Sequence, residues 1–379
     1  MLNILHITTF LNGGAGKALV DLVQYQKKLG YNVRVAANKQ EYEAYKHYPE
    51  HLDTLNDLGV KTDFYESVFK RNNFLNNRAS ASLYKSFNKY PKCNLIHAHA
   101  SVPAKVALNS FSSLTQKPKI IQTMHGWGLN KSLAMQNQDI YTMNCLDNVV
   151  ALNNSGKELL TTKGVTVSKV INIPYGISTK IPPKKYFDKK IESFIKKNWH
   201  LKFLCIGEIG ERKNQSFLFE ALKKLESSGI KCCVVLIGPE QHFGYIKNQI
   251  DKANVNHLVY WVGQLREADS YAHYFDAVVL PSKSEGMPLS ILEAFRAKIP
   301  FLGSSIPEFK DFIKHQKTGF LFNTKTTHMF THLIKSYDKI KWQNVAQNAY
   351  EEFISKYILE KMGQSYDTLY LNLIDLKYD

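Results

Sequence analysis

The 379 residues contain no run of about 18 consecutive apolar residues, so we expect no helix that spans a bilayer. Cysteine is also scarce. The five cysteines include no C-x-x-C pair, and we expect reduced core residues, with metal binding as a remote alternative. The opening MLNILHITTF has no Lys or Arg before its apolar residues and no small-residue cleavage site, which predicts a buried first strand in a cytoplasmic protein.

Acidic residues are outnumbered, with 33 Asp and Glu against 49 Lys and Arg, and the formal net charge is +16. Such an excess attracts an anionic partner, which can be nucleic acid, anionic lipid or a phosphate-bearing substrate. A general compositional bias toward lysine explains the same number equally well. The charge alone therefore does not choose among these partners.

The length predicts two domains of roughly 150 to 200 residues. Short apolar segments alternate with longer amphipathic ones, which is the pattern of βαβ units in parallel sheets. The first series of apolar segments comprises residues 3–8, 32–37, 94–99, 119–125, 148–153 and 169–174. After a Pro- and Lys-rich stretch, the second series comprises residues 202–206, 232–237, 258–262, 277–281 and 300–302.

These series divide the chain into four parts. We predict a Rossmann-like N-terminal domain over residues 1–178, a linker over 179–200 and a Rossmann-like C-terminal domain over 201–350. The pattern from about 342 to 376 is helical, and we expect residues 351–379 to pack back toward the N-terminal domain. The fold class is thus α/β, with two doubly wound domains facing each other across a ligand-binding cleft.

The segment VVLPSKSEGMPLSILEAF has the features of a phosphate-binding turn. A buried strand ends at Pro281, a loop contains Gly286, and a helix begins near Pro288, which suits the first helical position because it needs no N–H. Ligands bind at this end of a parallel strand, and a helix start offers unpaired amides. The residues expected to present N–H groups to a phosphate are Met287, Leu289 and Ser290.

Two glutamates, Glu285 and Glu293, have seven residues between them across this turn. Both can face one cleft and accept hydrogen bonds from paired hydroxyls, such as those of sugars and ribose. Together with E-G-M-P-L, this E-x7-E pattern resembles the retaining glycosyltransferases of family 4, which have the GT-B fold. The resemblance implies that Glu285 holds hydroxyls of the donor sugar and that Glu293 holds the ribose of the nucleotide.

A second segment, FLCIGEIGERKNQSFLFEAL, is a strand, a turn and a helix with Arg212 and Lys213 at the helix entrance. A fixed cation there stabilises the charge that grows on a diphosphate as the sugar departs. Lys213 matches the lysine that the family places on the diphosphate. The family commonly has an arginine where this chain has Glu208, so Arg212 either replaces that cation or is a solvated residue of the first helical turn.

The segment TTFLNGGAGKALVDLV places Gly13, Gly14 and Gly16 between the first strand and its helix. Glycines at that point let the backbone approach a phosphate, although the spacing fits neither a Walker A loop nor G-x-G-x-x-G. The alternative is a tight turn without a ligand. The family has a Gly-Gly loop here that faces the donor diphosphate and the acceptor, and the resemblance implies the same role.

In IIQTMHGWG, His125 ends a predicted strand and resembles the family's T-x-H-G segment beside the reacting sugar. The resemblance implies that His125 hydrogen-bonds the sugar, while the acceptor proton passes to the departing phosphate oxygen. We expect His97 and His99 to point to opposite faces of their strand, one structural and one near the cleft. For an H-x-H zinc site, the spacing indicates no third ligand.

Two further segments and one absent motif bear on the function. INIPYGI resembles the family's I-P-N-G-V at the end of the N-terminal domain, with Tyr175 where Asn is usual. No D-x-D occurs, which favours transfer without a metal or other cofactor. An aromatic and basic segment over 64–78 is either a contact with anionic membrane or an ordinary loop. It contains Phe64, Tyr65, Phe69, Lys70, Arg71, Phe74 and Arg78.

The leading hypothesis is a retaining, metal-independent hexosyltransferase that uses a UDP- or GDP-sugar. Its acceptor would be a glycan or a lipid-linked molecule of lipopolysaccharide, capsule or teichoic polymer, at the inner face of the cell membrane. A GT-B nucleotide-sugar epimerase or phosphorylase is the enzymatic alternative, against which E-x7-E with Lys213 argues. A basic nucleic-acid-binding protein is the non-catalytic alternative, but it requires a clustered basic face or a known binding fold. We therefore expect no nucleic-acid partner.

Overall fold

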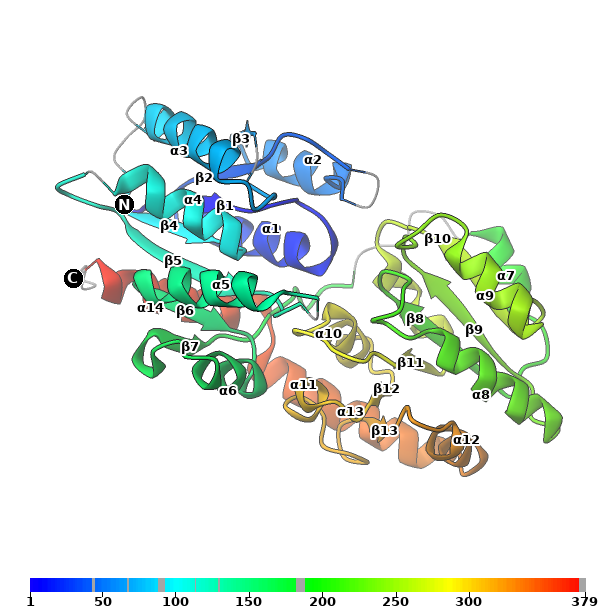
Figure 1. Cartoon of the computed structure of the whole chain (residues 1–379). Helices are drawn as coiled ribbons and strands as arrows, with labels where there is room; N and C mark the ends of the chain where they lie inside the picture. Colours follow the sequence, from blue (N-terminus) through cyan, green and yellow to red (C-terminus); the bar gives the residue numbers. More distant parts are fainter. Residues whose placement is uncertain are drawn as a thin grey trace. The chain divides into compact units, whose positions relative to one another are not determined.

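The computed structural model describes residues 1–42, 45–66, 68–87, 93–112, 114–128, 130–181 and 188–374. It consists of two compact units, one of Met1–Gly176 with Leu359–Asp379 and the other of Ile177–Ile358 (Figure 1). Each unit is a parallel β-sheet with helices packed against it. The prediction of an α/β fold with two doubly wound domains is therefore confirmed.

The N-terminal unit contains a seven-stranded parallel sheet in the order β3-β2-β1-β4-β5-β6-β7. Its strands are β1 Asn3–Ile7, β2 Asn32–Asn38, β3 Thr62–Tyr65, β4 Leu95–Ala98, β5 Lys119–Met124, β6 Asn148–Ala151 and β7 Val170–Asn172. The chain moves one way from β1 to β3 and the other way from β4 to β7. The strand order therefore reverses between the neighbouring strands β1 and β4, and open α/β sheets bind ligands near the carboxyl ends of strands at such a point.

Helices of the same unit connect and cover these strands. They are α1 Gly13–Lys28, α2 Pro49–Asp57, α3 Asn73–Phe87, α4 Ser101–Phe111, α5 Leu133–Cys145, α6 Asn154–Thr162, the short η1 Val167–Lys169, and α14 Leu359–Leu373. Although α14 comes from the C-terminal end of the chain, it packs on α1 (Figure 1). A Cβ at Gly363 would lie 2.5 Å from the Tyr25 ring, so glycine lets the two helices approach closely.

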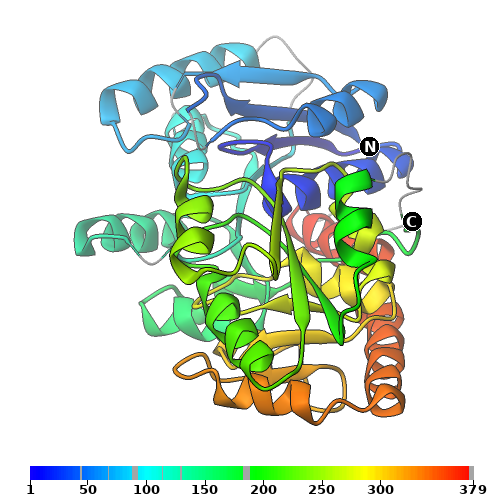
Figure 2. The ribbon, with the colours of Figure 1, turned by 90° about the vertical axis from the view of Figure 1, so that its right-hand side faces the viewer.

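The C-terminal unit, green to orange in Figure 2, contains a six-stranded parallel sheet in the order β10-β9-β8-β11-β12-β13. Its strands are β8 Leu201–Ile206, β9 Cys232–Ile237, β10 Val259–Gly263, β11 Ala277–Leu280, β12 Phe301–Ser304 and β13 Phe320–Phe322. Its helices are α7 Lys189–Ile195, α8 Ser216–Ser227, α9 Tyr245–Ala253, η2 Ala268–Tyr274, α10 Leu289–Arg296, α11 Pro307–Lys310, α12 His328–Lys335 and α13 Lys339–Lys356. Here the chain changes direction between β8 and β11, which are neighbours in the sheet.

Several elements differ from the sequence-based expectations. The strands β3 and β13 were not among the predicted segments, and the single helical stretch near the C-terminus is two helices interrupted at Tyr357. Residues assigned to a linker include α7, whose Ile191 and Phe194 are buried. Cys145 is exposed at the end of α5 rather than in the core. Among the described helices, none combines the length and apolar content needed to cross a membrane.

Candidate functional site

Two glycines shape the end of β8 and its neighbour β9. Gly207, directly after β8, has φ +147, and a Cβ there would lie 3.4 Å from Nζ of Lys213. Gly238, directly after β9, packs so closely that a Cβ would lie 2.0 Å from the carbonyl oxygen of Gly207. Both positions therefore require glycine. Neither glycine was predicted as a site residue, although each follows a predicted strand.

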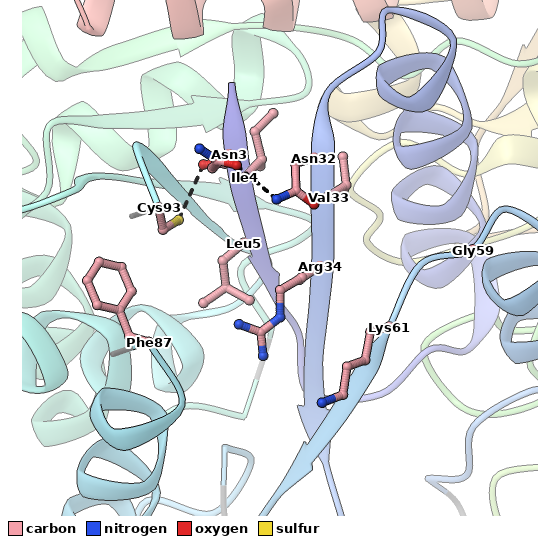
Figure 3. A pocket seen from close by; sticks show the side chains of 10 residues that line it. All are labelled: Asn3, Ile4, Leu5, Asn32, Val33, Arg34, Gly59, Lys61, Phe87 and Cys93. Atoms are coloured by element: carbon pink, nitrogen blue, oxygen red, sulfur yellow. Dashed lines mark hydrogen bonds between the residues drawn. The ribbon is translucent and has the colours of Figure 1, made fainter. Parts of the chain in front are cut away.

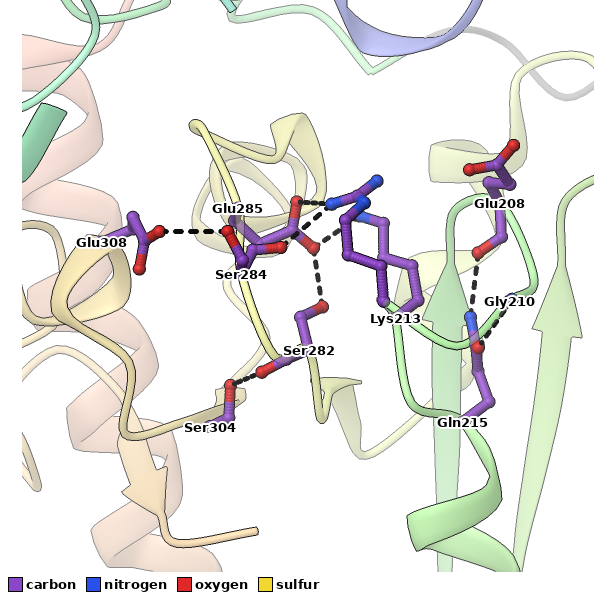
Figure 4. A network of polar contacts seen from close by, with 10 residues as sticks. Glu208, Gly210, Lys213, Gln215, Ser282, Ser284, Glu285, Ser304 and Glu308 are labelled. Carbon is purple, nitrogen blue, oxygen red and sulfur yellow. Dashed lines mark hydrogen bonds and ion pairs between the residues drawn. The ribbon is translucent and has the colours of Figure 1, made fainter. Parts of the chain in front are cut away.

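The loops after β8 and β11 bring two cations and a carboxylate together (Figure 4). Nζ of Lys213 lies 2.7 Å from Oε1 of Glu285, and Nη1 of Arg212 lies 3.0 Å from Oε2. Ser282 Oγ donates to the same Oε1 at 2.6 Å. Burial alone would raise the pKa of Glu285, whose side chain is 5% exposed, but Lys213, Arg212 and Ser282 lower it below its ordinary value. Glu285 is therefore ionised at neutral pH beside two positive charges.

Further hydrogen bonds hold these loops in place. Ser304 Oγ, at the end of β12, donates to the carbonyl of Ser282 at 2.5 Å. Asn214, with φ +58, donates from Nδ2 to the carbonyl of Pro281 at 3.0 Å. Gln215 donates to the carbonyl of Glu208 at 3.0 Å, as Figure 4 shows. The site is thus preorganised by contacts that link three neighbouring strands.

Helix α10 follows the loop of Glu285 after three residues and begins at Leu289. Pro288 precedes the helix with ψ 129, so it occupies the cap rather than the first helical position that we predicted. The first amides of a helix have no intrahelical acceptor, and its N-terminus has a partial positive charge. Glu293 lies in the second turn and is 8% exposed. The segment therefore offers anion-binding amides close to Glu285.

The three glycines of the N-terminal loop lie in different surroundings. Gly13 and Gly14, at the start of α1, are exposed, and Gly13 has φ +54 with open space where a Cβ would be. Gly16 is buried, and a Cβ there would lie 2.8 Å from the backbone carbon of Leu11. Gly13 and Gly14 are accessible to a ligand, whereas Gly16 allows the start of α1 to pack closely against the backbone of Leu11.

Four histidines gather at the carboxyl ends of β1, β4 and β5. His6 on β1 is the direct partner of His97 on β4. The rings of His97 and His99 are 4.2 Å apart, so our expectation of opposite faces was wrong, because residues two apart in a strand return to the same face. Nδ1 of His99 lies 3.0 Å from Nε2 of His125, and Nδ1 of His125 is bonded to the Tyr175 hydroxyl. Both ring nitrogens of His125 are therefore engaged within the N-terminal unit.

Burial keeps these histidines uncharged. It lowers the pKa of His6 and of His125 to about 4, and it lowers the pKa of His97 and of His99 well below the ordinary value. His6 was not predicted from the sequence, although a histidine inside the buried strand NILHI is an unusual residue for that position. Ligand atoms of His6, His97 and His99 lie within 4.8 Å of one another, so the third histidine that the spacing did not indicate is present.

Some side chains of the aromatic and basic segment over 64–78 pack inside the N-terminal unit, and others are exposed. Ser67 lies outside the described residues. Phe69 packs on Phe10 with ring centroids 4.9 Å apart, and Arg71 donates to Asp139 at 2.6 Å. Tyr65 is buried. The part that remains at the surface contains Phe64, Phe74, Lys70 and Arg78.

A separate cavity of about 190 Å³ lies in the N-terminal unit (Figure 3). Its lining includes Asn3, Arg34, Lys61, Phe87 and Cys93. It opens at the amino ends of β1 and β2, whereas the histidines and the exposed glycines lie at the carboxyl ends of their strands. The cavity is therefore distinct from the candidate site.

Comparison with known proteins assigns the family. The model described as Glycosyltransferase Family 4 matches residues 12–181, and the model described as Glycosyl transferases group 1 matches residues 187–352. The chain belongs to glycosyltransferase family 4. The two models match a large part of each unit of this glycosyltransferase.

Individual relatives agree with this assignment. UDP-Gal:alpha-D-GlcNAc-diphosphoundecaprenol alpha-1,3-galactosyltransferase of Escherichia coli is 23% identical over 77% of this chain and 79% of its own length. Glycosyltransferase 1 domain-containing protein 1 of Xenopus tropicalis is 30% identical over 59% of this chain and 67% of its own. The structure of Anabaena HepE in complex with UDP and glucose superposes with a TM-score of 0.81 at 16% identity, covering 97% of this chain and 99% of that one. The predicted GT-B fold is confirmed.

Proposed function

We propose that this family 4 glycosyltransferase moves a hexose from a UDP- or GDP-sugar to a glycan or lipid-linked acceptor with retention of anomeric configuration. The observation that supports it most is the placement of Lys213, Arg212 and Glu285 at the point where the strand order of the C-terminal sheet reverses. Crevices at such points are where open α/β sheets bind their ligands. The Escherichia coli relative is named for UDP-Gal, and HepE for its complex with UDP and glucose.

In the proposed complex, the donor diphosphate replaces the carboxylate of Glu285 as the partner of Lys213 and Arg212. The amides at the start of α10 donate hydrogen bonds to the same anion, since they lie at the positive end of the helix dipole. Glu285 then accepts hydrogen bonds from hydroxyls of the donor sugar, and Glu293 accepts those of the ribose. The ion pairs of the free enzyme thus keep Lys213 and Arg212 bound to a carboxylate until the donor binds.

The reaction breaks the bond between the anomeric carbon and the β-phosphate oxygen. The acceptor oxygen bonds to that carbon on the same face of the sugar, and its proton passes to the departing phosphate oxygen. Charge on this phosphate grows as the bond breaks, so Lys213 stabilises the transition state more than the bound donor. Such a transfer needs no separate base, which fits a His125 whose two ring nitrogens are already hydrogen-bonded.

The N-terminal unit is the part of the chain that we propose to bind the acceptor. The exposed Gly13 and Gly14 lie at the carboxyl end of β1 and allow close approach of a substrate to the backbone. The exposed Phe74 and Arg78 suit a peripheral contact with anionic lipid at the cytoplasmic face of the membrane. A lipid-linked precursor of lipopolysaccharide, capsule or a teichoic polymer is the acceptor class that this surface favours.

The test begins with thermal unfolding of the purified protein in the presence of UDP, GDP, ADP or CMP and the matching sugars, with EDTA present. A ligand that binds only the folded state raises the unfolding temperature. We expect a shift with UDP or GDP that is smaller in Glu293→Ala. The donor so identified is then incubated with lipid-linked acceptors, and NMR of the product reports the anomeric configuration. Absence of a shift with every nucleotide, or an inverted product, would contradict the proposal.

A further inference from the structure

Two chains of hydrogen bonds meet at the buried amide of Gln26 on α1. In the first, Oε1 of Gln26 lies 2.8 Å from Nε2 of His6, and Nδ1 of His6 lies 2.9 Å from Nε2 of His99. The chain continues from Nδ1 of His99 to Nε2 of His125 at 3.0 Å. It ends with the hydroxyl of Tyr175 at Nδ1 of His125. Gln26 on α1 is thereby connected to His125, which follows β5, and to Tyr175, which follows β7.

The second chain starts at the other atom of the same amide. Nε2 of Gln26 donates to the Tyr370 hydroxyl on α14 at 3.4 Å, and this hydroxyl lies 2.8 Å from Nδ1 of His97. Nε2 of His97 lies 2.7 Å from Oγ1 of Thr123. That hydroxyl lies 2.8 Å from the hydroxyl of Tyr366.

The chemistry of the amide fixes the direction of every bond in the first chain. An amide oxygen only accepts, so His6 donates from Nε2. A neutral imidazole has one donor and one acceptor, so Nδ1 of His6 accepts from His99, and Nδ1 of His99 accepts from His125. Tyr175 must then donate its proton to Nδ1 of His125. One amide orientation thus selects the Nε2–H tautomer of all three histidines.

The second chain agrees with the same orientation. Because Nε2 of Gln26 donates to Tyr370, the hydroxyl proton of Tyr370 is available for a bond to Nδ1 of His97. His97 then donates from Nε2 to Thr123. Reversing the amide of Gln26 would reverse every donor in the first chain, and it would also turn the Tyr370 hydroxyl toward Gln26.

A metal site is the competing explanation for three clustered histidines. All six ring nitrogens of His6, His97 and His99 have a hydrogen-bond partner within 3.0 Å. A cation would have to break several of these bonds. Metal-bound histidines usually also donate their other nitrogen to a carboxylate, a backbone carbonyl or water, whereas these histidines contact a side-chain amide, hydroxyls and one another. The geometry favours a hydrogen-bonded chain.

We propose that Gln26 is a positioning residue of this enzyme, which fixes the tautomer of His125 and so holds Tyr175 and the His125–Gly126 turn at the carboxyl end of β5. This inference rests on the proposed sugar transfer, since that turn resembles the segment beside the reacting sugar. Gln26 itself touches no substrate, because it is 2% exposed beneath α14. Tyr175, which stands where the family usually has Asn, supplies the hydroxyl that ends the chain.

The first experiment reads the tautomer directly. Protein labelled with ¹⁵N in its histidine rings gives separate NMR signals for protonated and unprotonated ring nitrogens, and the His125 signals are assigned by their loss in His125→Asn. We expect Nε2 of His125 to be protonated and Nδ1 unprotonated. Gln26→Leu should move both signals toward a tautomer mixture. Gln26→Glu, which retains an oxygen acceptor for His6, should keep the native pattern.

The second experiment measures turnover with the donor found by the nucleotide panel. Gln26→Leu should lower kcat roughly tenfold, as expected for one lost hydrogen bond, with little change in KM for the donor. Gln24→Leu is the matched control, since Gln24 is a half-buried residue of the same helix outside both chains. Gln26→Glu should restore most of the turnover.

The outcomes separate the two proposals. A wild type that transfers no sugar would refute the proposed function, whatever the NMR signals show. An active wild type in which Gln26→Leu changes neither the His125 signals nor kcat would refute the positioning role alone. Stoichiometric zinc binding that is lost in His6→Asn would also overturn it, because zinc would take the nitrogens that the chain requires.

Discussion

The ammonium of Lys213 lies 2.7 Å from the carboxylate of Glu285, and the two side chains come from the loops after the neighbouring strands β8 and β11. Both are largely buried, with side chains 10% and 5% exposed. Arg212 binds the second carboxylate oxygen, so the cluster has one more positive than negative charge. An excess of positive charge beside the start of α10 suits the donor diphosphate that we propose to bind there.

We expect Lys213→Ala to reduce kcat by roughly 10²–10³-fold, because removing one preorganised group that stabilises developing charge has an effect of this size. The KM for the donor should change much less, since the interaction strengthens as the phosphate departs. Steady-state kinetics with the identified donor provide the measurement. Lys252→Ala, at an exposed position of α9, is the control and should leave both constants unchanged. A loss of donor affinity without a loss of kcat would contradict this role.

The ion pair should also affect stability. Glu285→Gln leaves Lys213 buried beside a neutral group, and breaking a buried pair in this way costs about 3–5 kcal/mol of unfolding free energy. Urea unfolding at neutral pH should show this loss. Adding Lys213→Met to Glu285→Gln removes the uncompensated charge, so the double variant should recover much of the stability. If the single variant unfolds like the wild type, the pair is not a stabilising contact.

Acid should weaken the same pair. The pKa of Glu285 is lowered in the folded state, so its stabilising contribution is complete above the ordinary value of 4.5 and is lost as the pH falls through the lower folded value. The unfolding free energy of the wild type should therefore fall more steeply below pH 4.5 than that of the double variant. Parallel curves for the two proteins would argue against the ionised state of Glu285.

The nucleotide side of the site is tested at Glu293. If Glu293 holds the ribose, Glu293→Ala should weaken UDP or GDP binding roughly tenfold to hundredfold, as expected when hydrogen bonds to a charged group are lost. Calorimetric titration gives the affinity. Glu220→Ala, at an exposed position of α8, should bind like the wild type. Equal affinities for all three proteins would remove Glu293 from the proposed site.

Local sequence patterns predicted most strands because parallel strands buried on both sides are short apolar runs, as in CCVVLI of β9. They did not predict β3, since Asp63 and the exposed Phe64 interrupt the apolar pattern at an edge strand. They also missed the three-residue strand β13. Edge and very short strands depend on neighbours for their formation, and a local pattern does not contain those neighbours.

In the candidate site, too, local segments were predicted and contacts between distant segments were not. Lys213, Glu285 and Glu293 were predicted because they belong to short recognisable segments. The bond from Ser304 to Ser282 was not, since it depends on β12 lying next to β11. Likewise, the contact of His97 with Tyr370 joins residues far apart in the sequence and requires α14 to return to the N-terminal sheet.

The buried histidines make folding sensitive to mild acid. His6 and His125 have a pKa of about 4 when folded, whereas unfolded histidine titrates near 6.5. As the pH falls from 6.5 toward 4, the unfolded chain takes up protons that the folded chain does not. Each such histidine should then lower the unfolding free energy by up to about 1.4 kcal/mol per pH unit. Urea unfolding between pH 7.5 and 5 measures the slope.

A matched pair of variants checks the origin of this slope. His97→Asn removes one buried titrating group and should make the pH dependence less steep by about one proton. His242→Asn changes an exposed histidine and should leave the slope as it is in the wild type. The explanation fails if His97→Asn and the wild type have the same slope, because the buried cluster would then not be its source.

The last prediction concerns the cation that the family usually has at the position of Glu208. In this chain Nη1 of Arg212 lies 3.0 Å from Oε2 of Glu285 and 2.9 Å from the carbonyl of Ser284. Arg212 therefore places a positive charge at the site from a different sequence position than the family's arginine. Arg212→Ala should reduce kcat roughly tenfold to hundredfold through the loss of a charge-assisted contact. Adding Glu208→Arg to Arg212→Ala should restore part of this loss, whereas Glu208→Ala in the same background should not. If Arg212→Ala has wild-type kinetics, Arg212 is only a solvated residue of the turn before α8, and Lys213 is left as the cation that stabilises the leaving diphosphate.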